Sequence, residues 1–102
     1  MIVTLEEMKQ HLRIETDDED DLLQKLILQA QAVAEDFCRT TFGGTDEDGN
    51  AITVPEPVRL AAMLFVSHYY ENRDVAEKAV YNAMMTAFYN LLYPYRDISK
   101  MF

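Results

Sequence analysis

Residues 20–37 read DDLLQKLILQAQAVAEDF, and this stretch decides the fold class. Its apolar side chains recur every three or four positions, which places them on one face of an α-helix. The residues on that face are Leu22, Leu23, Leu26, Ile27, Ala30, Val33, Ala34 and Phe37. Polar and charged residues such as Gln24, Lys25 and Glu35 fall outside it. The period predicts one long amphipathic helix in a mostly α-helical protein.

A shorter helix is expected before this stretch, ending at about Leu12. Thr4 and Glu7 have the spacing of a capping box, in which each side chain binds the backbone N–H of the other residue. Such a cap stabilises a helix by about 1 kcal/mol. Residues 17–21 are all acidic, and negative charge in a first helical turn is favourable. The sequence therefore predicts a capped first helix and an acidic start to the second.

The helical period is interrupted at residues 39–54. Short β-branched or aromatic runs are separated there by Gly43, Gly44 and Gly49. This pattern is typical of a short β-hairpin or an ordered loop, and the sequence leaves both open.

Two further helices are expected after this interruption, at about residues 57–72 and 75–93. Proline is tolerated in a first helical turn, and Pro57 favours the start of the third helix. Pro94 ends the fourth helix, which leaves residues 94–102 as a C-terminal arm. The chain is thus predicted to form one four-helix domain over residues 1–102.

The last two predicted helices are apolar on more than one side. The third has Val58, Ala61, Ala62, Phe65 and Tyr69 on one face, with Leu60, Met63 and Leu64 nearly opposite. On the fourth, one stripe holds Val80, Ala83, Met84, Ala87 and Leu91, and a second holds Tyr81, Met85, Phe88, Tyr89 and Leu92. Residues 79–95 form a run of 17 without a charged side chain.

A domain of this size has one core, which cannot cover both sides of both helices. We expect one face to meet another copy of the chain, because Tyr and Met are enriched at protein interfaces. The alternative is that the two helices cross at the centre of the core. A membrane helix is a third interpretation, and the polar strip of Asn82, Thr86 and Asn90 argues against it.

The overall composition excludes several classes of protein. The 102 residues carry 18 acidic and 9 basic side chains, a net charge of -9, which disfavours binding to nucleic acid through its phosphates. Cys38 is the single cysteine, so an internal disulfide framework is excluded and a reducing compartment is favoured. The first residues lack the features of a signal peptide, and the longest apolar run, residues 60–66, is too short to span a membrane.

No catalytic or metal-binding pattern is found in the sequence. His11 and His68 lack a partner at the spacing of a helical zinc motif, and Ser67 and His68 are neighbours that point about 100° apart on a helix. The acidic residues around Gly49 do not fit the register of a calcium-binding EF-hand loop. We therefore expect no enzymatic activity, no metal and no cofactor.

Several short motifs, in this order, carry a resemblance. They are TLEEMK at 4–9, HLRI at 11–14, DLL at 21–23, AEDF at 34–37, VPEPVRLA at 54–61, YYENR at 69–73 and LYPYR at 92–96. The chain resembles the head–tail connector, or adaptor, family of long-tailed bacteriophages and prophages, members of which are also described as DNA-packaging proteins. The resemblance covers most of the chain except residues 43–53 and 76–90.

The resemblance implies a helical subunit that forms a ring under the portal at the head–tail junction of the virion. About twelve copies would match the portal, and a closed ring needs two different patches on each subunit. The ring would extend the DNA channel and bind the next connector or stopper protein, while DNA passes without specific binding. Assembly would take place in the host cytoplasm, with no membrane partner. The alternative function is a helical regulatory or chaperone-like module that binds a partner protein.

Two sets of residues are candidates for these roles. The expected subunit or partner interface comprises Leu60, Met63, Leu64, Tyr70, Tyr81, Met85, Tyr89, Leu92, Tyr93, Tyr95 and Arg96. The acidic residues expected to face the channel are Asp17, Asp18, Glu19, Asp20 and Asp21.

Overall fold

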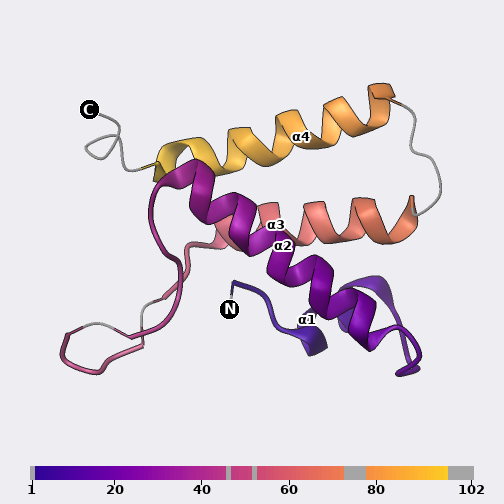
Figure 1. The fold of residues 1–102 in the computed structure, drawn as a ribbon, viewed down its shortest axis with the longest axis horizontal. Coiled ribbons are helices and arrows are strands. Elements are labelled where there is room, and N and C mark those ends of the chain that lie inside the picture. The colour runs from indigo at the N-terminus through magenta and orange to yellow at the C-terminus, as the bar shows by residue number, and fades with distance from the viewer. Residues whose placement is uncertain (1, 46, 52, 73–77, 97–102) are drawn as a thin grey trace.

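The computed structural model describes residues 2–45, 47–51, 53–72 and 78–96. Its elements are α1 (Leu5–Leu12), α2 (Asp20–Cys38), α3 (Glu56–Glu71), α4 (Lys78–Leu92) and the 3₁₀-helix η1 (Tyr93–Tyr95). The helices α3 and α4 lie antiparallel, α2 crosses them, and α1 packs near the first half of α2 (Figure 1). The predicted mostly helical fold is confirmed.

The capping box predicted for the first helix is present. The Glu7 backbone N–H donates to the Thr4 hydroxyl at 3.2 Å, and the Thr4 N–H donates to the Glu7 carboxylate at 3.1 Å. The helix ends at Arg13, whose φ of 59° is the left-handed conformation that closes many helices. Ahead of the cap, the Ile2 N–H donates to the Gln31 side chain at 3.0 Å, which fastens the N-terminal residues to α2.

The predicted long helix is confirmed as α2, and it supplies one wall of the core. Its inward side chains follow the expected period, and the fully or nearly fully buried ones are Leu23, Leu26, Ile27, Ala30, Ala34 and Cys38. The last turn of α2 contains no basic residue. Arg96, which follows η1, supplies the positive charge at this helix end, because its Nε donates a hydrogen bond to the Phe37 carbonyl at 3.1 Å.

A short β-hairpin and an ordered loop were the two alternatives for the segment between α2 and α3, and the structure shows the ordered loop. Its described residues form no strand and share one isolated antiparallel bridge, between Thr45 and Ala51. The turn between them includes Gly49 with φ of 83°, a conformation that glycine adopts without strain. At its base, the Phe42 N–H donates to the Glu35 carboxylate at 2.8 Å. The loop extends away from the helices (Figure 1).

The core closes where α4 packs on α3. Phe65 and Phe88 meet with ring centroids 5.4 Å apart, and both are almost completely buried. On α4 the buried positions are Met84, Phe88 and Leu92, at a spacing of four residues. The division of α4 into two stripes was therefore wrong in detail, because the inward face takes Met84 from one stripe and Phe88 from the other.

The remaining expectations for the C-terminal half are met in part. The structure shows α4 ending at Leu92, followed by η1, as Pro94 predicts. The expected helix start at residues 75–77 and the arm beyond Arg96 lie outside the described residues. Among the helices that the structure describes, none combines the length and the apolar character needed to cross a bilayer.

Candidate functional site

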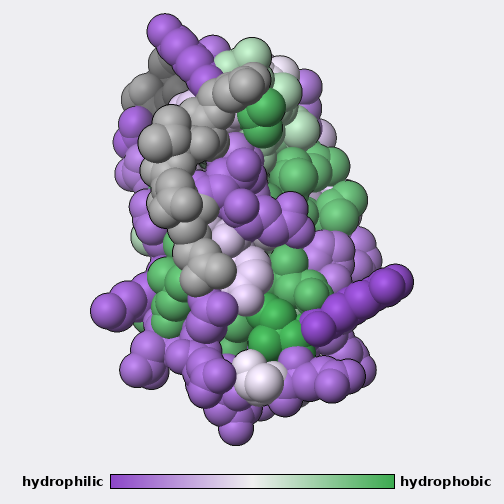
Figure 2. Space-filling model, turned by 90° about the vertical axis from the view of Figure 1, so that its right-hand side faces the viewer, coloured by the Kyte–Doolittle hydropathy of each residue, from purple (hydrophilic) through white to green (hydrophobic). Residues whose placement is uncertain are grey.

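Large apolar side chains are exposed on three of the helices and on η1. They are Leu28 at 57%, Leu60 at 53%, Val80 at 47%, Tyr81 at 37% and Tyr93 at 67% of their full accessibility. Hydrophobic surface also shows between hydrophilic residues on the face drawn in Figure 2. Single exposed apolar residues are ordinary on a folded protein, whereas a contiguous apolar patch marks an interaction surface. Of these five residues, Leu60, Tyr81 and Tyr93 belong to the predicted interface set.

The predicted interface residues on α3 divide into exposed and half-buried ones. Leu60 projects from the second turn into solvent, whereas Met63 and Leu64 pack partly against the core. Tyr70 is half-buried, and its hydroxyl donates to the Glu19 carboxylate at 3.1 Å. Leu60 is therefore the α3 residue of this set that is most available to a partner.

On α4 the predicted interface residues differ even more in burial. Tyr81 is exposed, Met85 and Tyr89 are half-buried, and Leu92 is completely buried. The Tyr89 ring packs against Phe37 of α2 with centroids 4.6 Å apart and the ring planes tilted by 47°. Leu92 is corrected to a core residue, since its place in the 84–88–92 row turns it inward. Tyr89 contributes mainly to packing within the subunit.

Tyr69 and Tyr81 form an aromatic cluster near the end of α3 and the start of α4. Their ring centroids are 6.4 Å apart, and the His68 ring lies 6.0 Å from Tyr81. Burial, with a smaller effect of the Tyr81 hydroxyl, raises the pKa of Tyr69 above its ordinary 10.0. The Tyr69 phenol therefore stays neutral at physiological pH.

Of the three predicted interface residues after α4, Tyr95 and Arg96 pack within the subunit, and Tyr93 projects into solvent. Arg96 lies 4.5 Å from the Phe37 ring centroid and donates to the Phe37 carbonyl. Tyr95 is half-buried and packs against the core. Tyr93 instead points outward and is the most exposed large apolar residue described. The motif LYPYR thus fixes the end of α4 to α2 while it presents Tyr93.

Two acidic residues at the start of α2 and just before it form ion pairs with Lys9 of α1. The Lys9 ammonium lies 2.6 Å from Asp17 and 2.9 Å from Asp20. The hydrogen bond with Lys9 lowers the pKa of Asp17 below its ordinary 3.8, and the one with Asp17 raises the pKa of Lys9 above 10.5. This contact therefore stabilises the fold between these ordinary values and is lost towards either extreme of pH. Asp18 and Asp21 are exposed.

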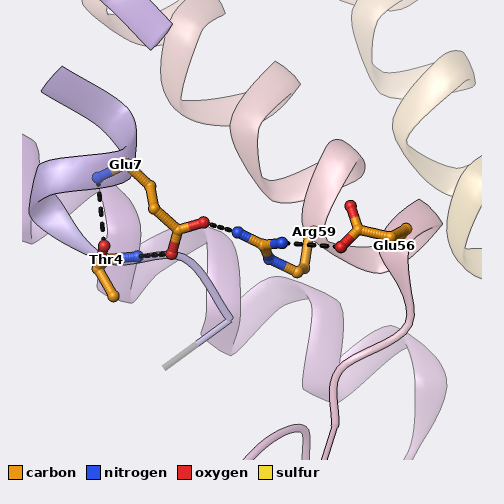
Figure 3. Close-up of polar contacts among 4 residues, drawn as sticks. All are labelled: Thr4, Glu7, Glu56 and Arg59. Atoms are coloured by element: carbon orange, nitrogen blue, oxygen red, sulfur yellow. Dashed lines mark hydrogen bonds and ion pairs between the residues drawn. The ribbon is translucent and has the colours of Figure 1, made fainter. Parts of the chain in front are cut away.

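A polar network that sequence reasoning missed joins α1 to α3. The Glu7 carboxylate accepts the Thr4 N–H and pairs with the Arg59 guanidinium, which also lies 2.8 Å from Glu56 (Figure 3). An open cavity of about 440 Å³ lies beside it, lined by Glu7, Gln10, His11, Arg59 and Met63. The spacing within each helix gave no sign of this cavity, because its two walls lie far apart in sequence, on α1 and on α3. The capping box was the one signal that marked Glu7.

The titratable residues considered for chemistry are dispersed. His11 is exposed on α1, and His68 is buried with its ring edge-on to Tyr69 at 5.3 Å. The Cys38 thiol is buried and 3.6 Å from the Leu92 carbonyl, and burial raises its pKa above 9.0. Within the described residues, no group of three or more His, Cys, Asp or Glu side chains is placed to hold a metal ion.

Removal of metal ions is therefore expected to leave stability unchanged. Thermal unfolding followed by circular dichroism should give superimposable curves with and without EDTA, because a structural metal contributes its binding free energy to folding. A fall of several degrees in the midpoint on chelation would contradict this prediction.

A known protein family matches nearly the whole chain. The model of the phage gp6-like head-tail connector protein family matches residues 2–100. Among the curated proteins and among the solved structures, no significant match was found. The matched range includes α1 to α4, the loop between α2 and α3, and Arg96, which contacts Phe37. Head–tail connectors are structural phage proteins of the head–tail junction and not an enzyme family. This chain belongs to the phage gp6-like head–tail connector family.

Proposed function

We propose that this connector assembles into a ring of identical subunits beneath the portal and extends the DNA channel towards the tail. About twelve copies would match the symmetry of the portal. One rim of the ring would bind the portal protein, and the other would bind the next connector or stopper protein. The observation that carries this proposal is the set of exposed apolar side chains on a member of a connector family.

The distribution of those side chains favours a ring over a two-fold dimer. A ring needs a heterologous interface, in which one patch of a subunit meets a different patch of its neighbour. Leu28 lies on α2, Leu60 on α3, and Val80 and Tyr81 on α4. The proposed ring would use this surface as two unlike patches, whereas a two-fold dimer needs only one patch that pairs with itself. A partner-binding regulatory module would also need only one.

The charges of the subunit fit a channel through which DNA slides. Asp18 and Asp21 are exposed at the start of α2, and the chain carries a net charge of -9. Acidic groups on a channel wall would repel the phosphates of DNA, and non-specific affinity arises from phosphate contacts with basic groups. We place this segment on the channel side of the proposed ring.

Particle shape tests the proposal directly. Negative-stain electron microscopy and native mass spectrometry of the purified protein at high concentration are expected to show closed rings of a single copy number. Assembly should strengthen as salt rises from 0.01 to 0.15 M, because the Debye length falls from about 30 Å to about 8 Å and repulsion between acidic subunits is screened. A protein that remains monomeric or forms only two-fold dimers under these conditions overturns the ring.

The isolated protein is expected not to bind double-stranded DNA measurably at physiological salt. Fluorescence polarisation of a labelled duplex should stay flat up to high micromolar protein, because the net charge of -9 opposes approach to phosphates. Micromolar binding that weakens steeply with salt would reject passive conduction and favour a DNA-binding packaging factor.

A further inference from the structure

Tyr93 is an exposed aromatic side chain on a rigid support. It begins η1, and Pro94 follows it within the same short helix. The Arg96 N–H closes this turn on the Tyr93 carbonyl at 3.2 Å, and the Arg96 side chain is fastened to Phe37. A side chain held on a fixed backbone loses little conformational freedom when a partner covers it.

The cavity between α1 and α3 has the features of a receptor for such a side chain. Half-buried Met63 supplies an apolar wall, and Gln10 and His11 supply hydrogen-bonding groups around the opening. The two charged residues of the lining, Glu7 and Arg59, form an ion pair with each other, and Arg59 also pairs with Glu56 beside the cavity. Leu60, between Arg59 and Met63 in sequence, adds exposed apolar surface on α3. The cavity is thus suited to an uncharged group with an apolar body and a polar tip.

Tyr93 matches this description better than the other exposed apolar residues. Leu28, Leu60 and Val80 have no polar tip for Gln10 or His11. Tyr81 has a hydroxyl group at its tip, but its ring already lies beside the rings of His68 and Tyr69. Tyr and other aromatic anchors that fill a pocket in the partner are the usual hot spots of interfaces.

The positions of the two features require that they meet between different copies. The C-terminal end of α4 and η1 lie at one side of the molecule, and α1 lies at the opposite side (Figure 1). Tyr93 itself brings no charge to the cavity, which matters between copies of a chain of net charge -9. We propose that Tyr93 of one subunit inserts into the cavity formed by Glu7, Gln10, His11, Arg59 and Met63 of the next subunit.

This contact rests on the proposed ring, and it gives that ring its two unlike patches. Each subunit would donate one tyrosine and accept another, so the contact is head-to-tail and can close around an axis. The tyrosine hydroxyl would bond to the polar groups at the mouth of the cavity. The contact uses residues from α1 and α3 on one side and from η1 on the other.

Crosslinking of mixed subunits tests the contact within the assembled particle. The variants Tyr93→Cys and Gln10→Cys are purified separately, mixed, allowed to assemble and treated with a short bismaleimide. The wild-type protein is the control, because its single thiol, Cys38, is buried. We expect a covalent pair only in the mixture. Crosslinking of Tyr93→Cys with itself would indicate a two-fold contact and overturn the inference.

Substitutions give a second, independent measurement. Tyr93→Ala is expected to raise the protein concentration needed for assembly by about 30-fold, whereas Tyr93→Phe, which keeps the ring, stays within a few-fold of wild type. Gln10→Trp fills the mouth of the cavity from an exposed position and should weaken assembly as much, with Gln10→Ala as its control. Rings that form normally with Tyr93→Ala or Gln10→Trp would overturn this contact and leave the ring intact, whereas a wild-type protein without rings overturns both.

Discussion

Phe88→Ala is expected to cost about 3–5 kcal/mol of folding free energy, the usual range for removing a buried Phe. Phe88 is completely buried, and its ring meets Phe65 of α3 and the neighbouring Tyr89, each at 5.4 Å between centroids. It is the middle residue of the row through which α4 packs on α3. Small domains have only about 5–15 kcal/mol of stability in total, so this one change removes a large part of it.

The measurement is urea and thermal unfolding followed by circular dichroism. For a domain of this size each kcal/mol shifts the melting midpoint by about 4–8 °C, so the expected fall is at least about 12 °C. Leu60→Ala is the matched control, because Leu60 is half exposed on α3 and should shift stability by no more than about 0.5 kcal/mol. A Phe88→Ala protein that melts within two or three degrees of wild type would show that α4 does not pack through this row.

The helices were predictable from the sequence because their signals are local. The period of α2 and the capping box at Thr4 and Glu7 depend on residues within a few positions of one another. Pro94 ends α4 for an equally local reason, the loss of a backbone donor. These features need no knowledge of what packs against them, and the structure confirms each one.

The side of a helix that turns inward was harder to predict when both sides are apolar. Residues 79–95 include no charged side chain that would mark the solvent face of α4. The sequence therefore does not show which of the two apolar stripes on this helix faces the core. The inward face is decided by Phe65 on α3 and Phe37 on α2, which take Phe88 and Tyr89 as partners. For this reason Leu92 was placed in the interface set and is found in the core.

Long-range polar contacts were equally invisible in the sequence. Arg96 is 59 residues from the Phe37 carbonyl that it caps, and Arg59 is 52 positions from Glu7. Nothing in the local spacing pairs them. The sequence therefore predicts that apolar surface is left for an interface, but the cavity between α1 and α3 is seen only in the folded structure.

Leu60→Asp is expected to abolish assembly while the subunit stays folded. Leu60 is half exposed, so an aspartate there remains hydrated in the monomer and costs little beyond its weaker helix propensity, about 0.5 kcal/mol. In an assembled interface the same carboxylate would be removed from water without a cation, in a contact between two strongly acidic chains. We expect at least about a 100-fold increase in the concentration needed for rings, which corresponds to about 2.7 kcal/mol per contact.

Two controls separate the local effect of this carboxylate from the effect of added charge. Gln29→Glu adds the same charge at an exposed position of α2 and should assemble nearly as wild type, and Leu60→Asn keeps the shape of the aspartate without its charge. Raising the salt concentration should help wild type and Gln29→Glu, because screening weakens repulsion between subunits. It should not rescue Leu60→Asp, since salt does not remove the cost of burying an unpaired carboxylate. Normal rings from Leu60→Asp would show that the interface does not cover Leu60. A loss of assembly in Gln29→Glu as large as in Leu60→Asp would show that added charge alone, and not its place at Leu60, weakens assembly.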